Sequence, residues 1–187
     1  YFHVVFTLPA ELRRLVRSHQ KALLPVLFRA AFEALAALSA DPKHLGAEVG
    51  ALAVLHTWTR TLEWHPHVHL LVPGGGLAPD GRTWVPARRL RHGTLFLVPV
   101  KAVAKRFRGR FLHLARRALP GVVFPDIPWG KKWVVFAKPT VQGAEAVLAY
   151  LGRYVHKTAI TDRALVGLRE DTVSFGYRQV ATNDERP

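Results

Sequence analysis

The sequence predicts one α+β domain, in which a largely antiparallel β-sheet is flanked by α-helices. Three observations support this fold class. β-prone segments are interspersed with amphipathic helical segments, several β-prone segments are joined by short turns, and 187 residues suffice for one substantial hydrophobic core. The apolar share of 49% also excludes a disordered chain. We therefore expect residues 1–187 to form a single domain.

The first half of the chain is expected to contain three strands and two helices. Pro9 stops the first strand, and Pro25 lies at a break or in the first turn of the second helix. In that second helix apolar residues recur every three or four positions, which is typical of a helix with one buried face. The expected strands are residues 2–8, 51–59 and 66–72, and the expected helices are residues 10–20 and 24–39.

The second half is expected to add short strands and two further helices. A Pro-Asp-Gly turn at residues 79–81 predicts a small hairpin around it. The three glycines at residues 74–76 open no evident helix, so we interpret them as a bend and not as a phosphate-binding loop. The expected elements are hairpins over residues 77–86 and 165–178, strands at 94–98 and 132–138, helices at 100–118 and 142–157, and a loop at 120–130.

The net charge of the chain indicates which class of partner it binds. The chain has 27 Lys and Arg against 13 Asp and Glu, a formal net charge of +14 and a pI near 11.1. Such an excess favours polyanions, with nucleic acid first and an anionic membrane surface second. No uninterrupted apolar run of about 18 residues is present, so we expect no transmembrane helix and no membrane partner.

The chain contains neither cysteine nor methionine. Disulfides and cysteine-based zinc sites are therefore excluded within these residues, which suits a cytoplasmic protein. The N-terminus is β-prone and lacks a basic leader, so we do not interpret it as a signal peptide. Without a start methionine, the sequence is expected to be a piece of a longer protein.

Two histidines in the strand expected at residues 66–72 predict a metal site. His67 and His69 flank one apolar residue, and because side chains alternate across a strand they share one face. Imidazole suits Zn, Mn, Fe and Ni, whereas Mg prefers oxygen ligands, so the pair alone does not select the ion. The alternative is that both histidines only pack or contact solvent.

A metal ion needs a third ligand, and the candidates are His56, Glu63 and His65. If the turn between the two strands centres between residues 62 and 63, His56 lies opposite His69 and Trp58 lies opposite His67. Directly paired residues point to the same face, so this register predicts a three-histidine site. A slip by one residue would send His56 to the other face.

Two tyrosines four residues apart are the candidate nucleophiles. Tyr150 and Tyr154 border the apolar stripe of the helix expected at 142–157, and Arg153 and Lys157 lie on their outer side. A phenol has a pKa near 10, and a neighbouring cation such as Lys157 favours the phenolate. The alternative is that the tyrosines are packing residues at the edge of a buried stripe.

The helix expected at residues 100–118 is the candidate DNA-binding element. Its apolar positions face inward, and its other face carries a row of cations that could follow a phosphate backbone. The alternative interpretation is an ordinary solvated helix face. The cations chosen as DNA-binding residues, together with Arg153, are Lys101, Lys105, Arg106 and Arg108.

These motifs resemble a known family of enzymes. His67-Val68-His69 resembles the His-hydrophobic-His (HUH) motif of single-strand DNA endonucleases, and Tyr150 with Tyr154 resembles its two-tyrosine version. The amino-acid sequence more specifically resembles transposases of rolling-circle insertion sequences of the IS91 type. The matching segments are residues 2–9, 40–48, 54–58, 65–77 and 150–154.

The resemblance implies an HUH fold of the replication-initiator and relaxase kind, with the active site on the exposed part of the sheet. It also implies metal-dependent cleavage and strand transfer of single-stranded DNA through a 5′-phosphotyrosine. The expected cofactor is a divalent ion, Mg or Mn. The expected partner is single-stranded DNA with hairpin-forming or specific element ends, in the bacterial cytoplasm.

Family members usually carry a cysteine-rich zinc module before this domain and an extension after it, and the 187 residues contain neither. Two other functions remain open on the sequence alone. One is a plasmid replication initiator or relaxase with the same cleavage chemistry. The other is a catalytically silent DNA-binding module of the same fold.

Overall fold

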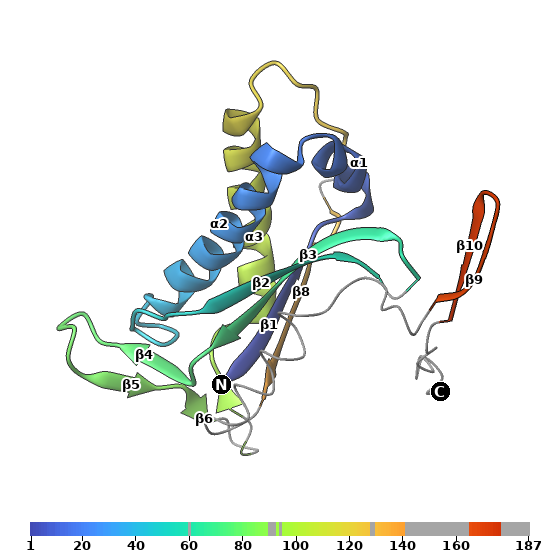
Figure 1. The fold of residues 1–187 in the computed structure, drawn as a ribbon. Coiled ribbons are helices and arrows are strands. Elements are labelled where there is room, and N and C mark those ends of the chain that lie inside the picture. Colours follow the sequence, from blue (N-terminus) through green and yellow to red (C-terminus); the bar gives the residue numbers. More distant parts are fainter. Residues whose placement is uncertain (60, 90–92, 94, 128–129, 141–164, 177–187) are drawn as a thin grey trace.

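Within the residues that it describes, the computed structural model of the protein combines one four-stranded sheet, three short hairpins and three helices (Figure 1). It describes residues 1–59, 61–89, 93, 95–127, 130–140 and 165–176. The helices are α1 (Ala10–Ser18), α2 (Gln20–Ser39) and α3 (Val100–Ala118). The strands are β1 (Phe2–Thr7), β2 (Leu52–Trp58), β3 (Trp64–Val72), β4 (Gly75–Leu77), β5 (Trp84–Pro86), β6 (Arg88–Arg89), β7 (Leu95–Phe96), β8 (Val134–Pro139), β9 (Leu165–Arg169) and β10 (Thr172–Phe175).

The main sheet has the strand order β2-β3-β1-β8, and every neighbouring pair is antiparallel. β1 is therefore an inner strand that pairs on one side with β3 and on the other with β8. Only β2 and β3 follow each other in the sequence, so the remaining pairings join distant segments. The antiparallel α+β prediction is confirmed for the described residues.

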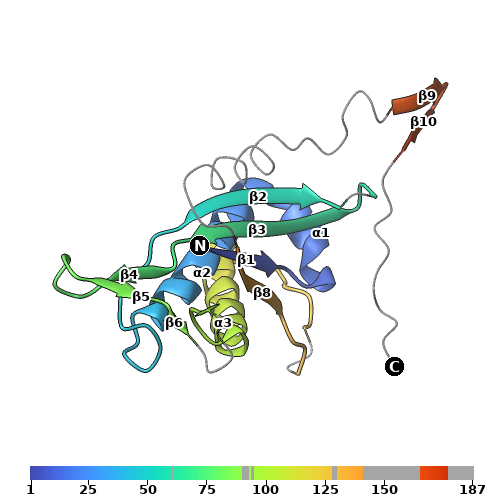
Figure 2. The same cartoon turned by 90° about the horizontal axis from the view of Figure 1, so that it is seen from below.

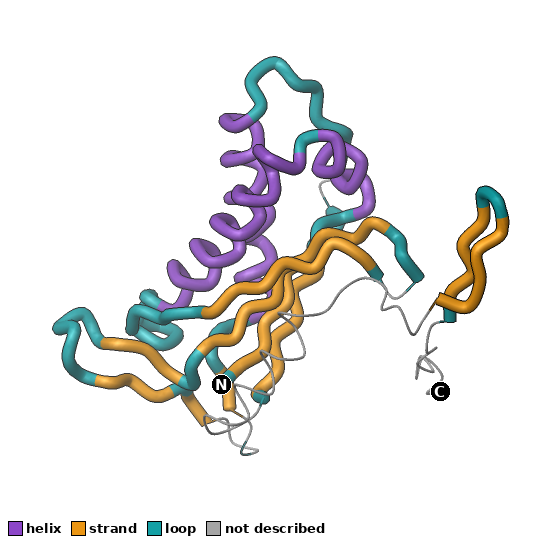
Figure 3. The backbone as a smooth tube through the Cα atoms, in the orientation of Figure 1, coloured by secondary structure: helices purple, strands orange, loops and turns teal. Residues whose placement is uncertain are grey.

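One face of this sheet is covered by helices, and we call it the helical face. Alternate residues of β1 (Phe2, Val4 and Phe6) are buried there, and the Phe6 ring meets Phe107 of α3 edge to face at 5.0 Å. Figures 2 and 3 show α2 and α3 side by side on this side of the sheet. The opposite side of the sheet, which we call the open face, carries the intervening residues of β1, including His3, Val5 and Thr7.

α2 differs from the predicted helix at its start. It begins at Gln20, so Pro25 lies inside the helix and not at its first turn. Pro25 lacks an N–H, and the carbonyl four residues earlier therefore loses its helical partner. Burial of the apolar stripe compensates for this loss, because Leu23, Leu27 and Leu35 are fully buried.

α2 is also long and apolar enough to meet the length and hydropathy criteria of a membrane span. Its best 18-residue window has a mean hydropathy of 1.6, with 44% of that window buried inside the protein. α2 packs along α3 and against the sheet, as a core helix of a globular domain does. Arg29 and Glu33 interrupt the apolar residues of α2, so the expectation of no uninterrupted apolar run of about 18 residues stands.

Two small hairpins extend the structure beyond the main sheet. β4 pairs with β5, as predicted, and β6 pairs with β7, whereas only the β7 region was predicted as a strand. Of the three glycines that we interpreted as a bend, only Gly74 lies at one, whereas Gly75 and Gly76 belong to β4, so that prediction was wrong for these two. A Cβ at Gly76 would lie 2.4 Å from the Glu48 carbonyl oxygen, so close backbone packing requires glycine there.

Candidate metal centre and nucleic-acid surfaces

Three histidines gather on the open face of the sheet. His56 lies on β2, and His67 and His69 lie on the neighbouring strand β3. One ligand nitrogen from each ring can be chosen so that all three atoms lie within 4.8 Å of one another. The ring centroid of His56 is 5.4 Å from that of His67 and 4.4 Å from that of His69. The predicted three-histidine cluster is therefore present, with donor atoms close enough to share one metal ion.

The register that forms this cluster differs from the predicted one. His56 pairs with His67 and Val54 pairs with His69, whereas we expected His56 opposite His69. Trp58 pairs with Trp64 and not with His67. The shift is by two residues, an even number, so His56 remains on the predicted face.

The cause of the shift is a bulge together with a different turn. His56 and Trp58 of β2 are separated by one residue, whereas their partners on β3, His67 and Trp64, are separated by two. β3 therefore contains one extra residue near Pro66. Pro66 has no N–H to donate, so a place where pairing is interrupted tolerates it well. The turn closes through the Thr59 N–H, which donates to the Glu63 carbonyl at 3.0 Å, while Leu62 adopts a φ of +62°.

The other two candidates for the third ligand are not part of the cluster. Glu63 lies in the turn, where its N–H donates to the Thr59 hydroxyl at 3.1 Å. His65 contributes its backbone, because its carbonyl oxygen accepts a hydrogen bond from His67 Nδ1 at 2.6 Å. This bond assigns the proton to Nδ1 of His67 and leaves Nε2 as its ligand atom.

A fourth histidine, which the sequence analysis did not select, supports the cluster from β1. His3 Nε2 lies 2.7 Å from His69 Nδ1, and the two rings stack at 5.0 Å with an interplanar angle of 11°. His69 is 8% exposed. Like His67, His69 therefore has its Nδ1 in a hydrogen bond and its Nε2 as the remaining ligand atom.

A sequence signal for His3 did exist. In β1 it alternates with the buried Phe2 and Val4, which assigns it to the opposite face from the core. What the sequence did not reveal is that β1 pairs with β3, which brings His3 next to the strand of His69.

Burial favours the neutral form of two histidines in this region, His67 and His3. It lowers the pKa of His67, an effect that the bond to the His65 carbonyl opposes and the nearby His56 reinforces. Burial also lowers the pKa of His3, and His56 adds to that effect. Neutral imidazole is the form that coordinates a metal, so the lowered pKa of His67 favours metal binding by this ligand near pH 7.

The predicted DNA-binding cations of α3 lie on the other side of the molecule. Phe107 and Phe111 of α3 are buried against the helical face, so Lys101, Lys105 and Arg106 project away from the sheet. Arg108 is half-buried, and its guanidinium donates to the Lys131 carbonyl at 3.4 Å. The structure therefore does not bring these cations together with the histidines.

The candidate nucleophiles Tyr150 and Tyr154, and the candidate cations Arg153 and Lys157, lie outside the described residues. So does the helix expected at residues 142–157. Their proposed roles remain predictions from the sequence.

Comparison with known proteins identifies relatives of this chain. Residues 50–187 match the Y2_Tnp family model, described as "Putative transposase". This match includes the histidines of β2 and β3 as well as both tyrosines. No solved structure matches the chain.

Two curated relatives carry transposase names. The first is "Putative transposase y4qJ" of Sinorhizobium fredii, 39% identical over 204 residues that cover 100% of this chain and 50% of the relative. The second is the "Transposase for insertion sequence element IS801" of Pseudomonas savastanoi, 30% identical over 191 residues that cover 94% of this chain and 44% of the relative. The chain thus spans about half the length of the curated relatives it matches.

Proposed function

The chain belongs to the Y2_Tnp family of transposases, and from this membership we propose that residues 1–187 are an HUH-type catalytic domain that cleaves and transfers single-stranded DNA. The observation that carries the proposal is the histidine cluster, because it sits on the side of the sheet that α2 and α3 leave uncovered. The family membership favours a transposase over a plasmid replication initiator or a relaxase.

The donor set fits a divalent metal ion. His56, His67 and His69 supply three imidazole nitrogens, and the Nδ1 hydrogen bonds of His67 and His69 direct both rings to coordinate through Nε2. Three protein ligands leave positions for phosphate oxygens, as in catalytic metal sites. When bound, the ion would polarise the scissile phosphate and compensate the charge that develops on it. Mn suits this nitrogen-rich site better than Mg.

We assign His3 the role of holding His69. For His69 to coordinate through Nε2, its Nδ1 must carry the proton and donate it to His3 Nε2. His3 is then a neutral acceptor with its own proton on Nδ1. This arrangement fixes both the tautomer and the ring orientation of His69.

Tyr150 and Tyr154 are the proposed nucleophiles. The phenol oxygen attacks the scissile phosphorus, a bond from phosphorus to tyrosine oxygen forms, and the bond to the 3′ oxygen breaks. The phenol proton is lost and the 3′ oxygen gains one, so the products are a 5′-phosphotyrosine and a free 3′-hydroxyl. Lys157 favours the phenolate, and we expect Tyr150 to attack first because Lys157 lies nearer to it on a helical wheel.

Trapping the covalent adduct tests this function. The chain is incubated with labelled single-stranded DNA bearing candidate element ends and Mn or Mg, and the adduct is mapped by peptide sequencing. Tyr150→Phe and Tyr154→Phe remove only a hydroxyl each, so the double variant should form no adduct while each single variant still nicks. Adduct formation in the double variant, or on Tyr177, would refute the assignment.

A further inference from the structure

The outward surface of α3 has features that the metal centre does not use. α3 contains no acidic residue, and five of its exposed cations make no ion pair within the described part of the chain. These five cations, which define what we call the basic surface, are Lys101, Lys105, Arg106, Arg116 and Arg117.

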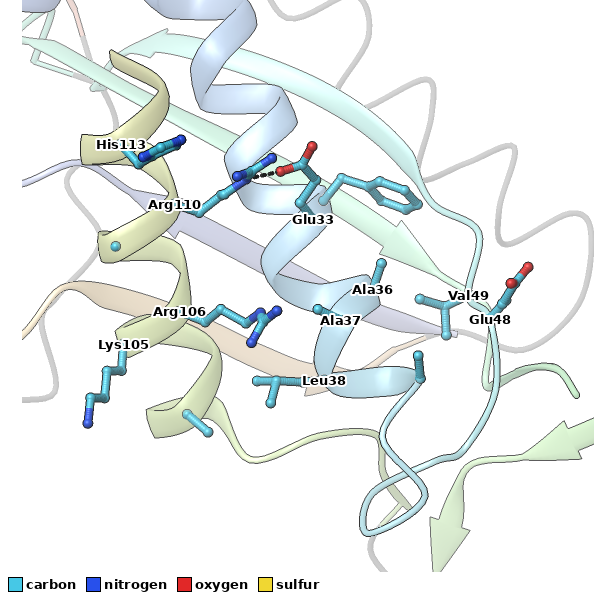
Figure 4. Close-up of a pocket in the computed structure, with 14 residues that line it drawn as sticks. Glu33, Ala36, Ala37, Leu38, Glu48, Val49, Lys105, Arg106, Arg110 and His113 are labelled. Carbon is cyan, nitrogen blue, oxygen red and sulfur yellow. Dashed lines mark hydrogen bonds and ion pairs between the residues drawn. The ribbon is translucent and has the colours of Figure 1, made fainter. Parts of the chain in front are cut away.

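Two hollows meet on this surface. The larger, of about 1090 Å³, lies between α2 and α3, with alanines of both helices in its lining and Lys105, Arg106 and Arg110 along its α3 side (Figure 4). The smaller, of about 740 Å³, follows the other side of α3 past Arg108 and Arg116. Gly109, Lys105 and His113 line both hollows, so these residues mark the ridge between them.

Gly109 at the centre of this ridge is not explained by packing. A Cβ added there would meet no atom within 4 Å, and the residue has ordinary helical geometry. Glycine in a helix interior costs about 1 kcal/mol relative to alanine. A bare backbone position with basic neighbours one turn away is instead suited to the close approach of a ligand from outside.

The carboxylates near the basic surface are few. Glu33, in the larger hollow, is paired with Arg110 and, at 2.7 Å, with Arg29. The Arg110 hydrogen bond, with Arg29 beside it, lowers the pKa of Glu33 to about 2, so Glu33 stays ionised and paired. Glu48 lies at the far end of the same hollow (Figure 4). The cations therefore dominate the field that an approaching ligand meets.

We propose that the basic surface around Gly109 binds the sugar-phosphate backbone of duplex DNA, as a second site separate from the metal centre. The proposal rests on the DNA-processing function above and adds which form of DNA this surface takes. Cations without a paired carboxylate complement phosphates. Proteins that hold unpaired bases add aromatic rings for stacking, and Phe32 is the only Phe, Tyr or Trp among the described residues that line the two hollows.

The position of the surface also favours a second site. α3 packs on the helical face of the sheet, whereas the histidines lie on the open face. One short strand held at the histidines therefore cannot contact the ridge at Gly109 as well. We expect a short single strand and a duplex to bind the chain at the same time.

Substitution of Gly109 separates DNA binding from folding. Gly109→Ala should raise Tm by about 2–4 °C because alanine is the better helix former. The same substitution should weaken binding of a labelled 20-base-pair duplex, measured in EDTA, and Gly109→Glu should weaken it by about tenfold or more. The matched control is Gly50→Ala, another position where a Cβ meets nothing, which should leave duplex affinity unchanged.

Removal of the cations gives an independent measurement. Lys105→Gln combined with Arg116→Gln should reduce the slope of log affinity against log salt by about 2, whereas Lys21→Gln with Lys43→Gln on other surfaces should not. Unchanged duplex affinity in both Gly109→Glu and the α3 double variant would overturn the proposal. So would full displacement of the duplex by a short single strand. Failure to form a tyrosine adduct would contradict the cleavage function while leaving duplex binding at α3 measurable.

Discussion

The two sides of the main sheet present different chemistry. The open face combines the histidine cluster with an exposed ring, since Phe136 of β8 is 50% exposed and pairs with Val5 of β1. The basic surface beyond the helical face has cations and almost no exposed ring. Among the described residues, the cations of α3 lie apart from the histidine cluster. Cleavage chemistry and electrostatic affinity can therefore be changed separately.

The largest expected effect comes from removing a metal ligand. His67→Ala should lower the rate of single-strand cleavage by roughly 10³-fold or more, because a catalytic metal contributes several kcal/mol to transition-state stabilisation. DNA binding should persist, since phosphate contacts supply most non-specific affinity. Gel assays of nicking and fluorescence anisotropy measure the two quantities.

His113→Ala on α3 is the matched control, because it removes an exposed histidine from the opposite side of the molecule. If both substitutions abolish cleavage equally, the separation of the two sides would be wrong. Retained cleavage in His67→Ala would exclude the metal hypothesis itself.

Salt should affect binding and chemistry differently. If about six phosphates are neutralised, DNA affinity should fall by roughly 10³ between 50 and 200 mM salt. His67→Ala should show the same slope, because the removed imidazole is neutral and lies away from the cations of α3. A salt-independent affinity would mean that the net charge of +14 forms no binding surface.

His3 offers a smaller and more specific test of the open face. His3→Phe keeps a ring but removes the acceptor for His69, so metal affinity should fall by about 10–100-fold. His3→Gln retains an oxygen acceptor and should recover most of this loss. Titration of Co²⁺, followed by its visible absorption, measures affinity and geometry without reference to cleavage.

A purely structural role for His3 would give a different result. Both substitutions would then weaken the metal site in proportion to their loss of Tm, and the Co²⁺ spectrum would keep its shape. Equal metal affinity in His3→Phe and the unmodified chain would refute the assignment.

The smallest expected effects are those of pH on folding stability. The histidines of the open face and Glu33 on the helical side should change stability in different pH ranges. In the unfolded chain His3 and His67 have a pKa near 6.5, whereas burial lowers their pKa in the folded chain. The unfolded state therefore binds more protons below pH 6.5, and the stability of the fold should decrease progressively as the pH falls below that value. Glu33 titrates near 4.5 when unfolded and near 2 when folded, so its ion pairs should lose their contribution only between these values.

Denaturant midpoints at several pH values, measured without metal, check both ranges. His3→Phe should flatten the profile just below pH 6.5, and Glu33→Gln should flatten it between pH 4.5 and 2. Identical profiles for these two variants would contradict the assignment of the two ranges.

Local sequence patterns predicted most of the elements. α3 matches its predicted bounds, because the apolar spacing of Val103, Phe107 and Phe111 fits a helix with one buried face. The two confirmed hairpins have turns marked by short polar or glycine-containing segments. The His67 and His69 pair was predictable for the same reason, since strand alternation is a local property.

What the sequence could not supply were the non-local pairings and the bulge. His56 was assigned to the correct face of the sheet but to an incorrect partner on β3. A shift of the pairing by two residues leaves the face unchanged. The partner itself depends on the turn and on the extra residue near Pro66, which the sequence did not reveal. His3 was missed because its contact with His69 depends on β1 pairing with β3. The opposite placement of Lys105 and the histidines likewise follows from three-dimensional packing.

The inner position of β1 has a consequence for how the chain is made. β1 is synthesised before either of its partners, and it pairs first with residues 64–72 and then with residues 134–139. Because synthesis proceeds at about 5–20 residues per second, both edges of the Phe- and Val-rich β1 remain unpaired for several seconds on the ribosome. The β2–β3 hairpin is local and can close early, whereas completion of the sheet is slow because its contacts are distant in sequence. Yield in expression should therefore be limited by aggregation of nascent chains, which co-expressed chaperones relieve, more than by the stability of the finished sheet.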